Sequence, residues 1–314
     1  MNNISPSGVP SGGKISSTTK GIIFAVISYF MWGVLPLYWS LLEAIDPFHL
    51  LGIRILLSFL ALGTILSLSK NFTWLAVFKN PKQMRVIIPA SIVLCTNWGL
   101  YLWAISQGRV IEASLGYYIN PLVSVMLGLI FLKEKLTRLQ WVAFGFACSG
   151  VLLLTVLSGA LPWISVLLAL CFGFYGLLKK RLKLSSLESL TAETLAAAPL
   201  GIFLLLVQVD TAAGLRFTVD LHSISYIAGL GAGILIILAF SGALTSFPLY
   251  CFGMGAKLLP LSMLGFLQFV APTLQFLLGI FFFGELFPAH FFTAFALIWI
   301  AAILHIISLA KRPH

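Results

Sequence analysis

Charge is scarce in this sequence of 314 residues, because only 9% of them are Asp, Glu, Lys or Arg. A soluble domain carries about 25% of these residues on a surface that faces water. Hydrophobic residues make up 60% of the chain, above the roughly 45–50% of soluble domains. The composition therefore excludes an ordinary soluble protein and indicates a chain that lies almost entirely in a membrane.

Cysteine, histidine and acidic residues are also few, and they are scattered. The 4 cysteines and 5 histidines show no CxxC or paired Cys and His spacing, so neither a metal site nor a disulfide framework is predicted. The 9 Asp and Glu residues do not cluster as the acids, bases or metal ligands of an active site do. We therefore expect no metal, no cofactor and no catalytic activity.

The sequence also lacks a phosphate-binding loop of the GxxxxGK[ST] type. Gly229, Gly231 and Gly233 follow no predicted strand and lie in an apolar run, so they do not predict a nucleotide site. The net charge of +10 suits cytoplasmic membrane loops, where Lys and Arg gather, better than a nucleic-acid surface. We expect neither ATP nor nucleic acid as a partner, and a lipid bilayer as the surroundings.

Long apolar runs fill most of the chain, and a membrane-spanning helix needs about 20 such residues. They predict an all-α integral membrane protein with ten transmembrane helices, separated by polar stretches such as Asp46-Pro47 and Lys133-Glu134-Lys135. The predicted spans are 21–42, 47–69, 85–107, 110–132, 138–157, 162–180, 187–208, 223–249, 258–283 and 289–310. Residues 1–20 predict a disordered cytoplasmic tail, and residues 311–314 predict a cytoplasmic C-terminal end.

The basic residues test this count, because Lys and Arg concentrate on the cytoplasmic side. When the N-terminus is placed inside, 2 of the 19 Lys and Arg residues, Arg109 and Arg216, fall in outside segments. Arg54 lies within a span. The other 16 fall in inside segments and are Lys14, Lys20, Lys70, Lys79, Lys82, Arg85, Lys133, Lys135, Arg138, Lys179, Lys180, Arg181, Lys183, Lys257, Lys311 and Arg312. We therefore expect a multi-pass protein of a bacterial-type inner membrane with both termini cytoplasmic.

The fourth predicted span is echoed in the ninth, and the first more weakly in the sixth. The matches are Asn120-Pro121, Gly128 and Glu134 with Ala271-Pro272, Gly279 and Glu285, each 151 residues apart, and Trp32-Gly33 with Tyr175-Gly176. A unit of five spans is odd, so residues 162–310 would cross the membrane in the opposite sense to residues 21–157. Inverted repeats recur in secondary transporters, with the substrate site near the midplane. The alternative is that the duplication records only how the fold arose.

Three segments resemble the RarD branch of the EamA-type transporters, in the drug/metabolite transporter superfamily. They are Glu112 to Val123, Tyr29 to Gly33, and Leu264 to Phe269 with Pro272. The resemblance runs from about residue 21 to residue 310. It implies a ten-helix fold of two inverted five-helix EamA repeats around a central cavity, and a carrier of metabolites such as amino acids, often an exporter. Lys133 departs from the family pattern, which often has Gly before the loop glutamate.

We therefore expect a secondary transporter that works by alternating access. Its substrate would be a small amphipathic metabolite or drug-like compound, with amino acids, aromatic compounds and export all among the options. Without an ATP site, the energy would come from a gradient or from the substrate itself. The alternatives are a non-transporting accessory or sensor subunit, and an integral-membrane enzyme, which the scattered acids and histidines disfavour.

Polar and aromatic residues on two spans are candidates for a cavity lining. Asn97 and Tyr101 are four residues apart and share one helix face, with Trp98 beside them. The alternative is that these side chains serve only helix packing or the aromatic belt at the membrane surface. The predicted substrate-binding residues are Asn97, Trp98, Tyr101, Tyr117, Asn120, Gln268, Trp32 and Tyr175.

Two prolines at matched positions predict helix kinks. Pro121 and Pro272 each remove a backbone donor and bend the helix, which leaves a carbonyl free. Matched interruptions in two halves indicate a binding site in transporters. The alternative is that both prolines only shape packing.

Arg54 and Glu193 are the charges predicted to lie deepest in the membrane, where a charge is by default a functional candidate. Their depths differ by about 10 Å at 1.5 Å per residue, too far for direct contact. Arg54 suits a structural or gating role, or binding of a substrate carboxylate, and Glu193 suits proton coupling. His305 is a further candidate for proton coupling, because histidine is the side chain that changes charge near neutral pH, and a hydrogen-bonded packing histidine is the alternative.

Overall fold

A computed structural model describes residues 16–107, 109–159, 163–210, 216–219, 222–284 and 292–310. Within these ranges nine helices are long and apolar enough to cross a membrane, and Phe292–Ser308 forms a shorter apolar helix. The predicted all-α membrane fold is therefore confirmed, while the count of ten spans stays a prediction. The N-terminal stretch 1–15, the end 311–314, Glu285 and His290 lie outside the described residues.

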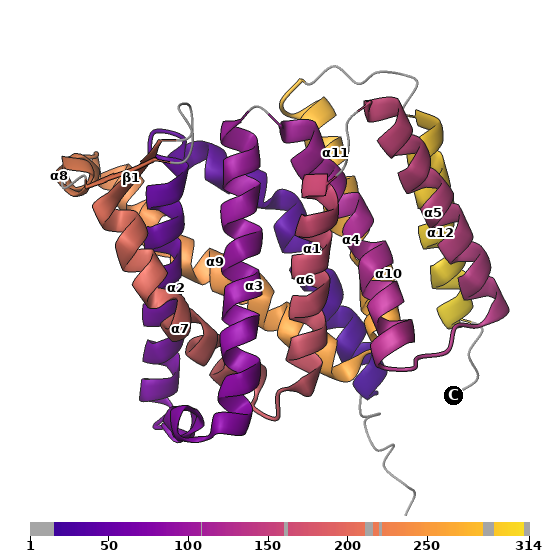
Figure 1. Ribbon diagram of the computed structural model, residues 1–314, viewed down its shortest axis with the longest axis horizontal. Coiled ribbons are helices and arrows are strands. Elements are labelled where there is room, and N and C mark those ends of the chain that lie inside the picture. The colour runs from indigo at the N-terminus through magenta and orange to yellow at the C-terminus, as the bar shows by residue number, and fades with distance from the viewer. Residues whose placement is uncertain are drawn as a thin grey trace, which may run out of the picture.

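The long helices form one bundle, which Figure 1 shows with the hairpin of β1 at one corner. They are α1 (Ser17–Trp39), α2 (Pro47–Leu68), α3 (Pro81–Ser106), α4 (Val110–Phe131), α5 (Arg138–Ser158), α6 (Trp163–Arg181), α7 (Ser186–Leu206), α9 (Ala232–Leu258) and a ninth that consists of α10 (Leu261–Leu267) and α11 (Val270–Phe281). The shorter helical elements are η1 (Ser40–Leu42), η2 (Thr73–Lys79), α8 (His222–Ala228) and α12 (Phe292–Ala310).

Short local signals decide where several helices begin. Asp46 caps α2 by accepting hydrogen bonds from the amides of Phe48 and His49, and a proline follows it at the first helical position. Thr137 with Gln140, and Ser185 with Glu188, form capping boxes at the starts of α5 and α7. These starts match the predicted spans to within one residue.

The eighth predicted span, 223–249, is placed wrongly. The long helix there is α9, Ala232–Leu258, and the first part of the predicted span is the separate short helix α8. Gly229 and Gly231 favour the break between α8 and α9 because glycine is a poor helix former. The end of α9 is set by Pro260, which pushes Leu259 into extended backbone at φ −112° and ψ 153°. Lys257 therefore lies in the last turn of α9 and not in a loop.

Three further elements differ from the predicted ones. The segment predicted as a loop after the seventh span contains a small antiparallel hairpin, in which β1 (Val207–Asp210) pairs with β2 (Arg216–Val219). The ninth span is a broken helix, because α10 ends at Leu267 and α11 begins at Val270. The first helix also starts at Ser17, four residues before the predicted boundary.

Helices from the two halves of the chain pack against each other. The helix pairs with the most extensive contacts are α1 with α9, α2 with α7, α3 and α4 with α6, α4 with α10, and α5 with α12. Figure 1 shows α5 and α12 together at one edge of the bundle and α2 and α7 toward the other. The middle of the bundle is left to α1, α3, α4, α6, α9 and the α10–α11 break.

A carboxylate holds the start of α10 against the end of α4. Glu134 accepts hydrogen bonds from the amides of Leu261 (2.6 Å) and Ser262 (2.8 Å), where the helix dipole favours negative charge. A Cβ on Gly128 would meet the Glu134 Oε2 atom at 2.6 Å, so glycine makes room for this contact. Lys133, which directly precedes Glu134, has a φ of 54°, in the left-handed region.

The left-handed backbone at Lys133 gives a stability prediction. Replacing Lys133 by Gly removes the steric cost of a side chain there, so the free energy of unfolding should rise by roughly 0.5–1 kcal/mol. The increase would be measured as a higher thermal midpoint of the purified protein in detergent. Lys135→Gly is the matched control, since Lys135 does not have a positive φ, and it should not stabilise. An equal gain in both variants would contradict this explanation.

Candidate functional site

A cavity of about 520 Å³ lies in the middle of the bundle and is lined by both halves of the chain. It extends to the end of the bundle where η1 connects to α2, since Glu43, Ile45 and Pro47 belong to its wall. The residues predicted from the sequence that line it are Trp32, Arg54, Asn97, Trp98, Tyr101, Tyr117, Asn120, Gln268 and Pro272. The structure thus brings together side chains from α1, α2, α3, α4 and the α10–α11 break.

One guanidinium stands in the cavity wall among aromatic rings. Arg54 Nε donates a hydrogen bond to Thr245 Oγ1 of α9 at 3.0 Å. The guanidinium carbon lies 4.1 Å from the ring centre of Trp39 and 5.8 Å from that of Trp98. Cation–π attraction of this kind stabilises a partly desolvated charge. Trp39 and Thr245 were not predicted as lining residues, because one helix sequence does not show which neighbour faces it.

Amide and phenol groups supply the remaining polarity. Asn97 Nδ2 donates to the Leu168 carbonyl at 2.9 Å, which fixes the amide at the α3–α6 contact. The rings of Tyr101 and Tyr117 meet edge to face, with centres 5.6 Å apart. Asn120 is only 4% exposed, and its Oδ1 atom has no hydrogen-bond partner among the described residues. An unsatisfied buried acceptor costs roughly 1–3 kcal/mol, which a donor on a ligand would offset.

An aromatic cluster closes the inner end of the cavity. The ring centre of Trp32 lies 5.3 Å from that of Phe172, and Phe172 lies 5.0 Å from Phe252. Tyr175 stacks on Phe252 at 5.7 Å and is fully buried. Tyr175 is therefore not a lining residue, contrary to the prediction, but lies behind the rings that form the wall.

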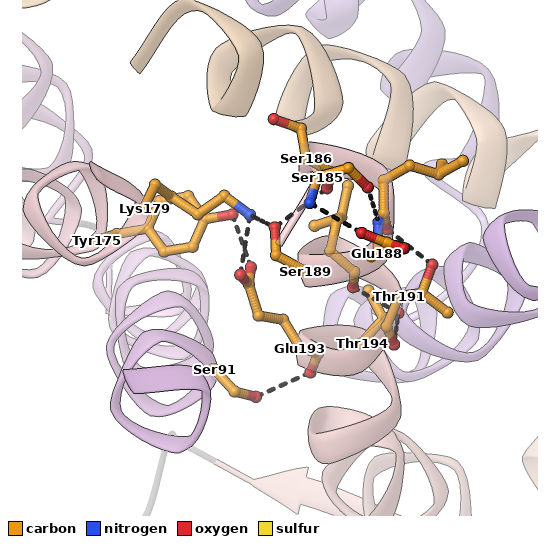
Figure 2. Close-up of polar contacts among 12 residues, drawn as sticks. Ser91, Tyr175, Lys179, Ser185, Ser186, Glu188, Ser189, Thr191, Glu193 and Thr194 are labelled. Carbon is orange, nitrogen blue, oxygen red and sulfur yellow. Dashed lines mark hydrogen bonds and ion pairs between the residues drawn. The ribbon is translucent and has the colours of Figure 1, made fainter. Parts of the chain in front are cut away.

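A buried ion pair lies next to this cluster, and Figure 2 shows its members converging on Glu193. Lys179 Nζ lies 2.8 Å from Glu193 Oε1 and 2.7 Å from Ser189 Oγ, and the Tyr175 hydroxyl donates to Glu193 Oε2 at 3.0 Å. The two charged side chains are 0% and 1% exposed. The Ser91 hydroxyl donates to the Glu193 backbone carbonyl, which ties α3 to the same point. The pair joins α6 to α7.

The sequence counts Lys179 with the basic residues of the inside segments, although residue 179 also falls within the predicted span 162–180. The structure buries its side chain completely. Lys179 lies in the last turn of α6, one helical turn after Tyr175 and on the same face. The four-residue spacing from Tyr175 is the signal that points inward. A basic residue at the end of a span usually extends its charged group to the membrane surface. The four-residue spacing is therefore easily overlooked in a single sequence.

The remaining predicted residues lie away from the cavity or behave differently. His305 is 1% exposed and stacks on Phe266 at a ring distance of 4.0 Å, and it does not line the cavity. The two prolines are not equivalent, because α4 continues as one helix through Pro121 while the second half breaks between α10 and α11. The Tyr118 hydroxyl donates to the Pro272 carbonyl at 3.1 Å and links the two proline-containing helices.

A bundle of membrane-length helices around a polar and aromatic cavity is the architecture of multi-pass membrane transporters of small molecules. Residues 19–156 match the model of the EamA-like transporter family. A solved crystal structure with 20% identity matches the fold at a TM-score of 0.67, covering 94% of this chain and 100% of that one. At that identity the match supports the fold alone.

The sequence relatives narrow the class to a family. The chain is 39% identical to Protein RarD of Streptomyces exfoliatus, across 90% of this chain and 87% of that protein. It is 39% identical to the uncharacterized transporter YojE of Bacillus subtilis (strain 168), across 94% and 96%, and 33% identical to Protein RarD of Escherichia coli (strain K12), across 92% and 94%. The chain belongs to the EamA-like transporter family, in its RarD branch.

The buried ion pair gives a second stability prediction. Glu193→Leu leaves the Lys179 ammonium buried without its partner, so the free energy of unfolding should fall by roughly 3–5 kcal/mol. The double variant Lys179→Met with Glu193→Leu removes both charges and should recover most of that loss. Thermal midpoints in detergent would measure both effects. A double variant less stable than Glu193→Leu alone would contradict a mutual pairing.

Proposed function

We propose that this EamA-family transporter is a secondary transporter for a small amphipathic compound with an aromatic or apolar body. It would work by alternating access in a bacterial inner membrane, with both termini cytoplasmic. The observation that carries the proposal is the 520 Å³ cavity, whose wall combines Asn97, Tyr117 and Gln268 with several aromatic rings. Ligand sites of this size are mostly apolar, with a few polar groups that set orientation.

Helix packing supports the predicted pair of inverted repeats, residues 21–157 and 162–310. Five spans separate a helix from its counterpart, so α1 corresponds to α6, and α3 corresponds to α9, the eighth span. The exchange of counterparts turns the contact of α1 with α9 into the contact of α6 with α3, and both contacts are present. The contacts of α2 with α7 and of α5 with α12 map onto themselves. A twofold relation of this kind places the substrate where the repeats meet, which is where the cavity lies.

Alternating access requires one closed end and one open end, and the two ends of the cavity differ in this way. Glu43 and Ile45 carry its wall to the connection between η1 and α2. We assign the closed end to Trp32 and Phe172, which belong to the wall and pack against Phe252 behind it. Behind these rings the Lys179–Glu193 pair holds α6 to α7. The described conformation is then open toward the η1–α2 connection. The Lys179–Glu193 ion pair keeps the other end closed by holding α6 to α7, and it is the latch of that end.

Glu193 is the proposed coupling site for a proton. It faces Lys179 and Tyr175 of α6 and Ser189 of α7, and Lys257 of α9 interacts electrostatically with the pair. Protonation of Glu193 would remove one half of the ion pair and weaken the latch. The position of Tyr175 then connects this event to the rings at the inner wall of the cavity.

The proposed cavity is tested by transport in proteoliposomes. A metabolite library weighted to aromatic compounds would first be screened by thermal shift, and stabilising compounds would then be followed as uptake. Asn97→Ala, Tyr117→Phe and Gln268→Ala should each reduce saturable uptake roughly 5- to 12-fold, because each removes a polar contact worth about 1–1.5 kcal/mol. Thermal midpoints would verify that the variants fold.

Ser149→Ala is the matched control, since Ser149 is exposed on α5 and bonds only to its own helix. It should transport as the native chain does. If no compound stabilises the native protein and no counterflow occurs, the transporter proposal fails and the accessory-subunit alternative gains support.

Proton coupling makes a separate prediction. In Glu193→Gln the side chain keeps its shape and loses its charge, so uptake driven by a pH gradient should fall at least about 10-fold. Substrate counterflow without a gradient should persist, because it needs no net proton movement. The two rates would be compared in the same vesicles, and gradient-driven uptake equal to that of the native chain would exclude Glu193 as the coupling group.

A further inference from the structure

Arg54 is the one cationic side chain among the described residues that line the cavity. It lies seven residues into α2 from Pro47, which is roughly 10 Å along the helix at 1.5 Å per residue. A charge at such a depth is costly unless it is compensated. What compensates Arg54 therefore bears on what the cavity holds.

The protein itself supplies hydrogen-bond acceptors for only part of the Arg54 guanidinium. Of its five N–H groups, one donates to Thr245, and the others have no acceptor within the described part of the chain. The rings of Trp39 and Trp98 stabilise its positive charge but neutralise none of it. The described residues contain no carboxylate in ion-pair contact with Arg54. The remaining N–H donors of the Arg54 guanidinium are thus available to a ligand in the cavity.

Glu43 is the one acidic side chain among the described lining residues, and it cannot fill this role. It is exposed, at the end of η1, where water solvates its charge and weakens its attraction for a cation. The deeper polar groups of Asn97, Asn120 and Gln268 are neutral amides. The inner part of the cavity therefore carries the positive charge of Arg54, and the described residues that line it supply no carboxylate there to pair with an ammonium group.

We propose that Arg54 binds a carboxylate of the substrate, and that the substrate is an organic anion with an aromatic body and no required amino group. This inference rests on the proposed function and names its substrate class. A guanidinium pairs with a carboxylate through two parallel hydrogen bonds, stronger and more directional than neutral ones. The rings of Trp39, Trp98 and Tyr101 line the space beside it and match a flat aromatic body.

The charge of the ligand is tested on the native chain with matched aromatic probes. Phenylacetate, benzoate and indole-3-acetate carry a carboxylate, their primary amides have the same body without charge, and 2-phenylethylammonium carries the opposite charge. Binding to the full chain in detergent would be followed by tryptophan fluorescence, since Trp39 and Trp98 lie beside Arg54. At least one acid should bind 10-fold or more tightly than its own amide and than the ammonium compound.

Variants of Arg54 assign the preference to this side chain. Arg54→Gln should lower the affinity for the acid to that for its amide, and Arg54→Lys should restore only part of it, because lysine keeps the charge but not the fork. Arg138→Gln, on the exposed start of α5, is the matched cationic control and should change neither. Thermal midpoints would show that each variant folds, and the comparison of acids with amides needs no variant.

Three results would overturn the inference. They are equal affinity of the acids and their amides, tighter binding of the ammonium compound, and an acid preference that survives in folded Arg54→Gln. If neutral or cationic compounds bind and exchange in a way that depends on Asn97 and Gln268, the proposed function stands and only the anion assignment fails. If compounds of every charge neither bind nor exchange, the proposed function itself fails.

Discussion

The absence of water inside a bilayer is the constraint on which the rest of this structure depends. Every buried backbone group must find a partner within the protein, so the chain crosses as helices. The same constraint applies to charge. Glu134 is compensated by the amides at the start of α10, and Lys179 by Glu193, Ser189 and the hydroxyl of Tyr175 next to that carboxylate. Arg54 differs, because rings and one hydroxyl leave its charge without an anion.

The break between α10 and α11 meets the same constraint. Gln268 and Phe269 keep right-handed helical dihedrals there. Pro272 has no amide hydrogen for the Gln268 carbonyl, which accepts a hydrogen bond from the Ala271 amide at 3.2 Å instead, so this backbone group stays satisfied. Gln268 is 5% exposed and belongs to the cavity wall, so the break lies beside the cavity.

The cavity and the buried ion pair are not independent features. Tyr175 connects them, because its hydroxyl donates a hydrogen bond to Glu193 while its ring lies 6.0 Å from that of Phe172 in the cavity wall. A rearrangement of the ion pair must displace the Tyr175 hydroxyl, and close packing passes such a displacement to neighbouring rings. Tyr175 would thus connect the two sites in the proposed proton-coupled transport.

The sequence by itself determined that the protein is a helical membrane protein, where most helices begin, and which spans carry polar groups, because apolar run length and capping residues are local properties. Asn97, Tyr117 and Gln268 could be predicted as cavity residues for that reason. Only the tertiary structure decided that Tyr175 lies behind the wall, that Lys179 pairs with Glu193, and that Trp39 and Thr245 meet Arg54. Each of these contacts joins different helices, and one helix does not specify the rotation or depth of its neighbour.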